Sequence, residues 1–326
     1  MSNLPWIEKY RPKTIEEVLN HDDKVLAMKK LADNNELPHL LLTGPPGTGK
    51  TSFIHNLAKY MYGEDEYRKY IRDINGSSER GIDTIRNTVI SFIQTKSQKT
   101  KLIILDEAEA LTHEAQSALK SVIEVYSKSA RFCLVCNDAS KIISAIHSRC
   151  CKLIFTYIDP PLVKRRLQDI SLKENMNITE EALDYLVNNE RDFRQVINLL
   201  QSIKVYSEAT DQKVDVATIT NYMGLPSPEK INECITVLFS GSHAAIVTQI
   251  KKLCMSGEVN LLVLVQALSK RLASMDSKKL SVDQMILAYK TLSDIEKKIR
   301  LDCSQDILFN LLAATFLKIR FDMKKN

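Results

Sequence analysis

The chain has 326 residues, of which 44% are hydrophobic and 26% charged, with a formal net charge of +5. This balance is typical of a globular protein, and the length allows two or three domains. The charge is too modest for a stand-alone nucleic-acid-binding domain, and no apolar run reaches the roughly 18 residues of a bilayer span, which predicts an intracellular protein with no membrane segment.

The seven cysteines are scattered and odd in number, which is not the pattern of a disulfide framework. Two of them, Cys133 and Cys136, have the spacing of a zinc-binding pair. They lie, however, inside an apolar run, and no second pair accompanies them. The pattern therefore favours buried thiols in a strand over a zinc site.

In the first half of the chain, short apolar runs alternate with stretches that have helical periodicity. The apolar runs predict strands at residues 39–43, 70–74, 102–106, 131–136 and 152–155. The stretches between them predict helices at residues 50–62, 81–93, 112–126 and 139–147. Strands that are apolar throughout are buried on both faces, and their alternation with helices predicts an α/β fold with a parallel sheet.

The strand pattern ends after Phe155, and two Pro-containing breaks follow, at residues 159–161 and 224–228. Helices are predicted at residues 161–175, 179–188, 192–206, 214–222, 229–240, 242–255, 259–274, 282–300 and 304–321. We therefore expect three domains: an α/β domain at 1–158, a small helical domain at 159–225 and a helical C-terminal domain at 226–326.

One motif in the α/β half has a strong phosphate-binding signature. It matches the pattern G-x-x-x-x-G-K-[ST] and reads Gly44-Pro45-Pro46-Gly47-Thr48-Gly49-Lys50-Thr51. It follows a predicted strand and opens a predicted helix, so backbone N–H groups and the helix N-terminus can face phosphate oxygens. We expect Lys50 to reach the β- and γ-phosphates of ATP and the Thr51 hydroxyl to bind Mg²⁺.

Polar residues end two of the predicted strands, at the edge where parallel sheets bind ligands. Asp106 is placed to hold Mg²⁺ through water, and Glu107 is placed to polarise the attacking water. Glu109 is interpreted as a surface or bridging acid rather than a catalytic one. Asn137 ends the next strand, where its amide can hold the lytic water or touch the γ-phosphate, although a turn residue is also common there.

Together these motifs resemble the clamp-loader branch of the AAA+ ATPases. Residues 6–12, Trp-Ile-Glu-Lys-Tyr-Arg-Pro, resemble the opening motif of that family, and the acidic box, Asn137 and Ser148-Arg149-Cys150 follow in family order. Residues 192–201 resemble its lid-helix motif D-x-R-x-x-x-N-x-L-Q. The chain resembles the small subunits of replication factor C, of the type of yeast subunit 3 and human subunit 5.

The resemblance implies an ATPase subunit of a heteropentameric nuclear complex that loads a PCNA-like sliding clamp onto primer-template DNA during replication and repair. Its partners would be the other replication factor C subunits, the clamp and the DNA, and its cofactors would be ATP and Mg²⁺. The residues to which the resemblance gives roles are Trp6, Tyr10 and Arg11 near the adenine, Asn137 and Arg194 as phosphate sensors, and Arg149 as an arginine finger. Such a finger acts on the ATP of a neighbouring subunit and can contribute about 10³-fold in rate.

The resemblance also implies that the predicted helix at 81–93 follows the DNA backbone. Arg80 and Arg86, at the start of this helix, and Lys141 are the candidate DNA-binding residues. Contacts of this kind to phosphates carry no sequence preference. Arginines that only face solvent are the alternative interpretation.

Two other functions remain open at this point. A branch-migration helicase motor has a related opening motif, but it needs a winged-helix domain at its C-terminus, whereas residues 226–326 predict long helices. A scaffold subunit that binds ATP without hydrolysing it is the other alternative, and the presence of Glu107 argues against it.

Overall fold

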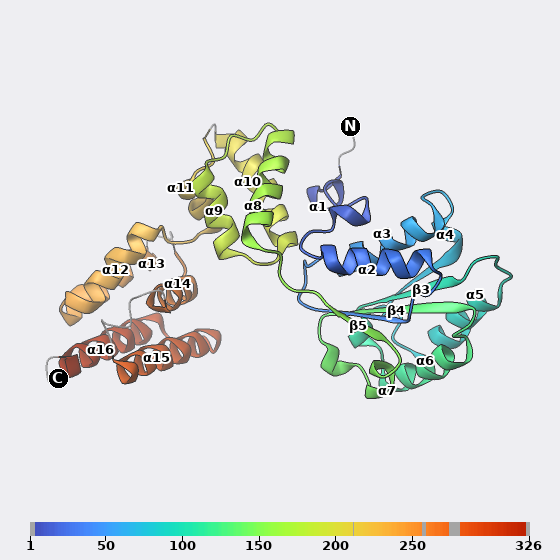
Figure 1. The fold of residues 1–326 in the computed structure, drawn as a ribbon. Coiled ribbons are helices and arrows are strands. Elements are labelled where there is room, and N and C mark those ends of the chain that lie inside the picture. Colours follow the sequence, from blue (N-terminus) through green and yellow to red (C-terminus); the bar gives the residue numbers. More distant parts are fainter. Residues whose placement is uncertain (1–3, 211, 256–258, 274–280, 324–326) are drawn as a thin grey trace. The chain divides into compact units, whose positions relative to one another are not determined.

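The structure is a computed structural model that describes residues 4–210, 212–255, 259–273 and 281–323, apart from the side chains of residues 84–86, 255 and 323. The chain forms two compact units. The first comprises residues 1–176 and 183–202, and the second comprises residues 177–182 and 203–326. The first unit contains a sheet with helices on both faces, and the second is helical (Figure 1).

The first unit is built on a five-stranded sheet with the strand order β2-β3-β4-β1-β5. Its strands are β1 Leu40–Thr43, β2 Ile71–Asn75, β3 Lys101–Asp106, β4 Ala130–Cys136 and β5 Cys151–Ile154. All neighbouring strands are parallel. The predicted α/β fold class and the five predicted strands are therefore confirmed, and β1 lies inside the sheet between β4 and β5.

Successive residues of β1 belong to different hydrophobic cores. Leu40 and Leu42 pack in one core with Phe53, and Leu41 packs in the other with Leu119. All five side chains are fully buried. Burial on both faces of the sheet explains why the three leucines of this strand follow one another without a polar residue between them.

Helices of the first unit cover these two faces (Figure 1). The core that contains Leu40 includes residues of α2 Asp22–Asp33 and α3 Lys50–Tyr62, and the core that contains Leu41 includes residues of α5 Ile90–Gln94, α6 His113–Val125 and α7 Ser144–His147. The remaining helices of this unit are α1 Trp6–Lys9, α4 Tyr67–Tyr70 and α8 Pro160–Lys173. Two helices, α9 Glu180–Asn189 and α10 Phe193–Thr210, contribute residues to both units.

Two predicted helices are wrong in detail. The prediction for residues 81–93 was one α-helix, but a π-helical segment at Thr84–Val89 precedes α5. The prediction for residues 139–147 was also one helix, but a 3₁₀ turn at Ala139–Lys141 precedes α7. Asp138 explains the second difference, because its carboxylate accepts hydrogen bonds from the N–H and the hydroxyl of Ser140 and so closes a tight turn.

The second unit confirms the predicted helices of the C-terminal region. They are α11 Val216–Met223, α12 Pro228–Ser240, α13 His243–Met255, α14 Leu261–Ala273, α15 Val282–Arg300 and α16 Gln305–Met323. Phe309 and Phe316 of α16 are fully buried in the core that α12 to α16 share. None of the helices that the structure describes has both the length and the apolar composition that crossing a membrane requires.

His39 lies at the start of β1 and is part of the sheet's hydrogen bonding. Its Nδ1 accepts a hydrogen bond from the N–H of Phe132 at 3.2 Å, and its carbonyl accepts one from the N–H of Cys151 at 2.7 Å. Burial, and then the nearby charge of Arg131, lower the pKa of the His39 imidazole to about 4. Protonation of Nδ1 would remove the acceptor that Phe132 uses.

We expect His39→Gln to make the stability of the first unit less dependent on pH. An unfolded histidine titrates near 6.5, so the lowered folded pKa means that stability present above about pH 6.5 is lost as the pH falls toward about 4. Glutamine keeps an acceptor but does not titrate. Chemical denaturation at about pH 7.5 and about pH 5 should show a smaller loss of unfolding free energy in the variant.

The control for this experiment is His113→Gln, because His113 is exposed. This variant should keep the wild-type dependence on pH. If the unfolding free energy falls between the two pH values by as much in the His39 variant as in the wild type, the role of His39 is contradicted.

Candidate active site

The P-loop connects β1 to α3, as its sequence context predicted. Gly44, Gly47 and Gly49 have φ angles of 147°, 73° and 88°. A Cβ on Gly44 would lie 2.0 Å from the carbonyl oxygen of Phe155, and one on Gly47 would lie 2.0 Å from Oδ1 of Asp192. All three positions therefore favour glycine for their backbone conformation, and Gly44 and Gly47 also require it for the close approach of neighbouring segments.

Lys50 is buried with its ammonium inside the concave side of the loop. Its Nζ donates hydrogen bonds to the carbonyl oxygens of Gly44 and Pro45, each at 2.7 Å, and to Oδ1 of Asn137 at 3.0 Å. Burial is the main cause that lowers the pKa of Lys50, and the positive charge of Arg194 lowers it further. An anion beside this ammonium would offset both effects, so the loop is suited to bind negative charge.

The acidic end of β3 lies opposite the start of α3. The Thr51 hydroxyl donates a hydrogen bond to Oδ2 of Asp106 at 2.9 Å, and the N–H of Glu107 donates one to Oδ1 of Asp106 at 2.9 Å. Glu107 has a left-handed backbone conformation, with φ at 51°, and its side chain is exposed. Asp106 is thus fixed beside Thr51, while Glu107 turns away from the core.

Gly76, which follows β2, packs closely against this acidic end. Its N–H donates a hydrogen bond to the carbonyl of Asp106 at 2.7 Å. A Cβ at this position would lie 2.5 Å from the carbonyl oxygen of Glu107. Any larger residue at position 76 would therefore displace the backbone of Glu107.

Asn137 follows β4 and lies beside the P-loop because β4 pairs directly with β1. Its N–H and its Nδ2 donate hydrogen bonds to the same oxygen of Glu109, Oε1, each at 3.0 Å. Glu109 therefore bridges the ends of β3 and β4. The sequence suggested a bridging acid at this position but gave no signal for its partner, which depends on the pairing of the strands.

Two cavities share the P-loop as a wall. The larger has a volume of about 300 Å³, and the smaller has a volume of about 80 Å³. The larger one is lined by Ile7, Glu8, Tyr10, Arg11, Pro12, Glu17, Val18, Leu19, Gly47, Thr48, Gly49, Thr51, Ser52, Asp106, Ile158, Arg166, Phe193, Arg194 and Ile197. The smaller one is lined by Pro46, Gly47, Thr48, Gly49, Lys50, Thr51, Asp106, Glu107, Val135, Cys136, Asn137 and Arg194.

These linings give the two cavities different chemistry. The lining of the larger one includes apolar side chains, among them Val18, Ile158 and Phe193, which can pack against an aromatic base. The smaller one is polar, with the ammonium of Lys50 and the carboxylate of Glu107 in its wall. The sequence motifs identified most of the polar residues of the smaller cavity, whereas Val18 and Ile158 of the larger one lie outside every motif.

The opening motif is anchored to α10 and to the residue that follows α8 in the same unit. The N–H of Trp6 donates a hydrogen bond to Oε1 of Gln201 at 2.9 Å, and the Tyr10 hydroxyl donates one to Glu174. Burial and this hydrogen bond raise the pKa of Tyr10. Tyr10 and Arg11 line the larger cavity, whereas Trp6 packs edge-on against Tyr10, outside the residues that line it.

Arg194 lines both cavities. It lies at the start of α10, where its N–H donates a hydrogen bond to Oδ1 of Asp192 at 2.9 Å. Arg166, on α8, also lines the larger cavity and donates a hydrogen bond to the carbonyl of Tyr10 at 3.3 Å. Arg194 was predicted from its motif, whereas Arg166 was not predicted, because it has no motif around it.

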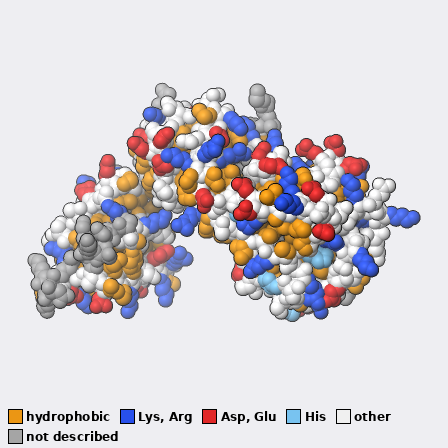
Figure 2. Space-filling view, in the orientation of Figure 1, with side chains coloured by type: hydrophobic (Ala, Val, Ile, Leu, Met, Phe, Trp, Pro, Cys, Tyr) orange, Lys and Arg blue, Asp and Glu red, His pale blue; other side chains and the backbone are white. Residues whose placement is uncertain are grey.

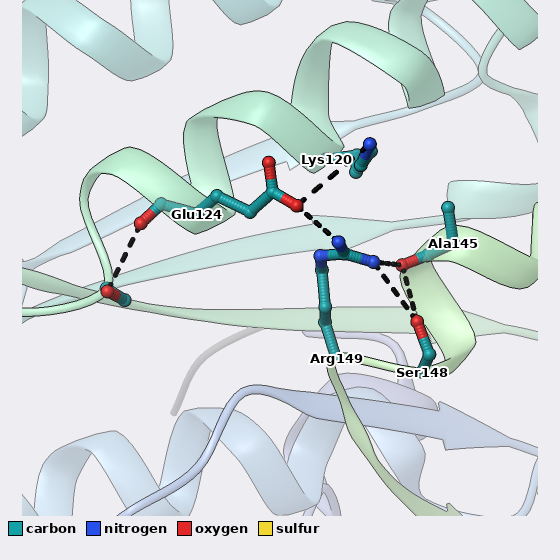
Figure 3. A network of polar contacts seen from close by, with 6 residues as sticks. Lys120, Glu124, Ala145, Ser148 and Arg149 are labelled. Carbon is teal, nitrogen blue, oxygen red and sulfur yellow. Dashed lines mark hydrogen bonds and ion pairs between the residues drawn. The ribbon is translucent and has the colours of Figure 1, made fainter.

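Arg149 lies away from these cavity walls and is bound within its own chain (Figure 3). Its Nη1 donates to the carbonyl of Ala145 at 2.7 Å and to the hydroxyl of Ser148 at 3.1 Å. Its Nη2 donates to the carboxylate of Glu124, which Lys120 also approaches at 4.0 Å. About a third of the Arg149 side chain, 31%, is exposed, so the guanidinium is accessible at the surface.

The candidate DNA-binding residues lie at the surface where the structure describes them. Arg80 is exposed, and its Nε donates a hydrogen bond to the carbonyl of Ser77 at 2.8 Å; Lys141 is also exposed. The side chain of Arg86 lies outside the described residues. On the face shown in Figure 2, basic and acidic side chains are intermingled, which agrees with the modest net charge.

The cysteine pair lies in β4, where both thiols are free and buried. Burial raises the pKa of Cys133 and of Cys136. Since zinc binds the thiolate form, this environment disfavours a metal at the pair.

Comparison with known proteins identifies the family. Residues 40–157 match the family model described as "ATPase family associated with various cellular activities (AAA)". The chain is 36% identical over 328 residues to "Probable replication factor C subunit 5" of Dictyostelium discoideum, a match that covers 98% of this chain and 92% of that protein. It is 33% identical to "Replication factor C subunit 3" of Schizosaccharomyces pombe, over 96% of this chain and 91% of that one. It is 41% identical to human "Replication factor C subunit 5", over 68% of this chain and 69% of that one.

Solved structures agree on the fold. The Thermotoga maritima RuvB Holliday junction branch migration motor superposes with a TM-score of 0.54, covers 80% of this chain and 91% of that one, and is 17% identical in sequence. Identity this low supports the fold alone. The sequence relatives instead carry the assignment: this chain belongs to the replication factor C subunit family, and it is an AAA-type ATPase of that clamp-loader family.

Proposed function

We propose that this chain binds and hydrolyses ATP as one subunit of a hetero-oligomeric clamp loader, which opens a sliding clamp and places it on primer-template DNA. The observation that carries the proposal is the arrangement of Lys50, Thr51 and Asp106, with a buried ammonium inside the P-loop and the Thr51 and Asp106 oxygens 2.9 Å apart. The ammonium and the loop match a triphosphate, and the oxygen pair matches its metal ion. Membership of the replication factor C family supports the role of a clamp-loader subunit.

Thr51 and Asp106 fit Mg²⁺ as the metal. Hydroxyl and carboxylate oxygens are the hard groups that Mg²⁺ prefers, so the Thr51 hydroxyl would bind the ion and Asp106 would hold it through a bound water. Among the described residues, no group of three or more His, Cys, Asp or Glu is arranged to hold a metal. Phosphate oxygens and water would complete the shell, and the bound ion would neutralise charge on the β- and γ-phosphates.

Three further side chains of this unit act on the γ-phosphate and the attacking water. Glu107, exposed and in the wall of the smaller cavity, orients the water and accepts its proton. Asn137 donates from its amide to the water or the γ-phosphate. Arg194, which lines both cavities, places a positive charge beside the phosphates.

Arg149 acts in trans, on the ATP of a neighbouring subunit. It is absent from the described walls of both cavities of its own chain, and its guanidinium is accessible. Its partners are its own Glu124, Ser148 and Ala145. In the ring, the neighbour's phosphate would replace the Glu124 carboxylate as the acceptor, so that hydrolysis depends on assembly.

The domains, the adenine side of the site, the DNA contacts and the location of the complex are assigned as follows. We assign residues 1–158 to the ATPase domain, residues 159–225 to a helical lid and residues 226–326 to a helical domain that holds the subunits together. Trp6, Tyr10 and Arg11 shape the adenine side of the site. Basic residues, Arg80, Arg86 and Lys141, contact DNA phosphates without sequence preference, and the complex works in the nucleus.

The alternative of a branch-migration motor is not favoured. RuvB shares the fold at 17% identity, whereas the relatives that match over most of the chain are replication factor C subunits. Between residues 228 and 323, apart from 256–258 and 274–280, the structure describes helices α12 to α16 and no strand, which is unlike a winged-helix domain. A scaffold that binds ATP without turnover is disfavoured because Glu107 is present in the smaller cavity.

We expect Lys50→Ala to weaken ATP binding by about 100-fold, because charge-assisted hydrogen bonds to phosphate contribute about 2 to 3 kcal/mol. Titration of the purified chain with a fluorescent ATP analogue measures this. Lys59→Ala, in the last turn of the same helix, is the matched control and should bind normally. Unchanged affinity in the Lys50 variant would remove the P-loop from its assigned role.

We expect Glu107→Gln to keep ATP binding within about 2-fold and to slow hydrolysis at this subunit's site by at least about 100-fold. Glutamine preserves the shape of the side chain but cannot accept the proton. Single-turnover hydrolysis should be measured in a reconstituted complex in which the P-loop lysines of the other subunits are replaced. A normal rate in that complex would show that Glu107 is not the base.

We expect Arg149→Ala to leave ATP binding at its own site unchanged and to slow hydrolysis in the neighbouring site by about 10³-fold. Complexes with a single competent site, placed either in this subunit or in its neighbour, separate the two effects. Lys120→Ala is the control, because Lys120 approaches the same Glu124 carboxylate. A defect confined to this subunit's own site would contradict the trans assignment.

A further inference from the structure

Asn137 is held between a carboxylate and an ammonium at the carboxyl edge of the sheet. Its N–H and its Nδ2 both donate to Oε1 of Glu109, each at 3.0 Å. Its Oδ1 accepts a hydrogen bond from Nζ of Lys50 at 3.0 Å. The side-chain amide is therefore bound at both of its ends.

The two partners leave only one orientation for this amide. An ammonium can only donate hydrogen bonds, and an ionised carboxylate can only accept them. In a flipped amide, the NH₂ group would face Lys50 and the oxygen would face Glu109, so both contacts would be repulsive. The carboxylate of Glu109 thus determines, together with Lys50, which way the Asn137 amide points.

We infer that Glu109 is the positioning residue for Asn137 in ATP hydrolysis, an inference that rests on the proposed role of Asn137 in that reaction. Nδ2 carries two hydrogens, and when one is bonded to Glu109 the other serves a phosphate oxygen or a water in the smaller cavity, which Asn137 lines together with Glu107. A donor that is oriented beforehand needs no reorganisation during the reaction. Glu109 is not among the described residues that line either cavity, so it acts through Asn137.

The burial of Glu109 supports this inference. Its second oxygen, Oε2, is buried and has no hydrogen-bond partner among the described residues. An unpaired buried carboxylate oxygen costs free energy. Other gains must therefore keep the carboxylate in this place, and retention of a costly polar group is typical of positions that serve a site.

The same hydrogen bonds also tie the end of β3 to the end of β4, so a purely structural role has to be separated from positioning. A structural role predicts that a change at Glu109 lowers stability and ATP affinity whether or not Asn137 keeps its amide. A positioning role predicts slower turnover with little change in affinity. It also predicts that this effect disappears once the Asn137 amide has been removed.

The test is a double-mutant cycle in the full chain. Each variant is assembled into a complex in which this subunit's site is the only one able to hydrolyse ATP. The variants are Glu109→Gln, Asn137→Ala and the two combined. A glutamine at this position can both donate and accept, so the orientation of the amide then depends on Lys50 alone. Glu109→Asp is a second variant that keeps the charge but withdraws the carboxylate by one methylene. If the Glu109→Gln protein does not fold, Glu109→Asp takes its place in the cycle.

We expect both Glu109 variants to lower kcat by about 10- to 100-fold while KM stays within about 3-fold. On the Asn137→Ala background, the Glu109 change should cause no further loss. Glu114→Gln, an exposed acid in the first turn of α6, is the matched control and should turn over normally. Thermal unfolding of each variant reports any structural effect separately.

The outcomes distinguish this inference from the proposed function. If Asn137→Ala is slow, two results would overturn the positioning role alone. One is normal turnover in Glu109→Gln, and the other is a double variant in which the losses of the two single variants add. Normal turnover in Asn137→Ala would overturn the role of Asn137 itself, and the inference with it. A raised KM with unchanged kcat in the Glu109 variants would assign Glu109 to the structure of the loop instead.

Discussion

The parallel pairing of β1 with β4 and β5 is the constraint on which the rest of the site depends. Because β1 lies between these two strands, the P-loop leaves the sheet with Asn137 on one side and Phe155 on the other. The next strand beyond β4 is β3, which brings Asp106 within 2.9 Å of Thr51. β1 is buried along its whole length and β4 is buried except at Arg131, whereas β5 forms an exposed edge of the sheet. Burial of the two inner strands between helical layers stabilises their pairing and so fixes the edge that carries the chemistry.

The charged groups at this edge are held in place by one another. Lys50 donates to two loop carbonyls and to Asn137, Asn137 donates to Glu109, and Thr51 donates to Asp106. Binding of a triphosphate would exchange the acceptors of Lys50 rather than order a disordered side chain. Burial lowers the pKa of Lys50, and the approach of phosphate would raise this pKa again, because a nearby negative charge favours the ammonium form.

Arg149 differs from these groups in being bound near the surface. Its contact with Glu124 is between two partly exposed side chains, 31% and 44% accessible. Ion pairs of this kind contribute little to stability, so the contact can be exchanged at small cost. Under the proposed function, this property suits a residue that must be bound in the separate subunit and then reach the phosphate of a neighbour after assembly.

The strands, most of the helices and the motif residues could be predicted from the amino-acid sequence, because each of these is encoded locally. Apolar runs predicted all five strands, and the spacing of glycines before Lys50 predicted the phosphate loop. The helix at 22–33 was not predicted, although Val25, Met28 and Ala32 recur at helical spacing on its buried face. The π-helical turn at 84–89 was also missed, because nothing in its composition distinguishes it from an α-helix.

Which distant residues meet could be learned only from the packed chain. The strand order brings Glu109 to Asn137, and the packing of the opening segment leaves Trp6 outside the larger cavity. Val18, Ile158 and Phe193, which line the larger cavity, come from three segments that share no motif. Local periodicity specifies each element and its buried face, but contacts between elements depend on how the whole chain packs, and a single sequence does not record that packing.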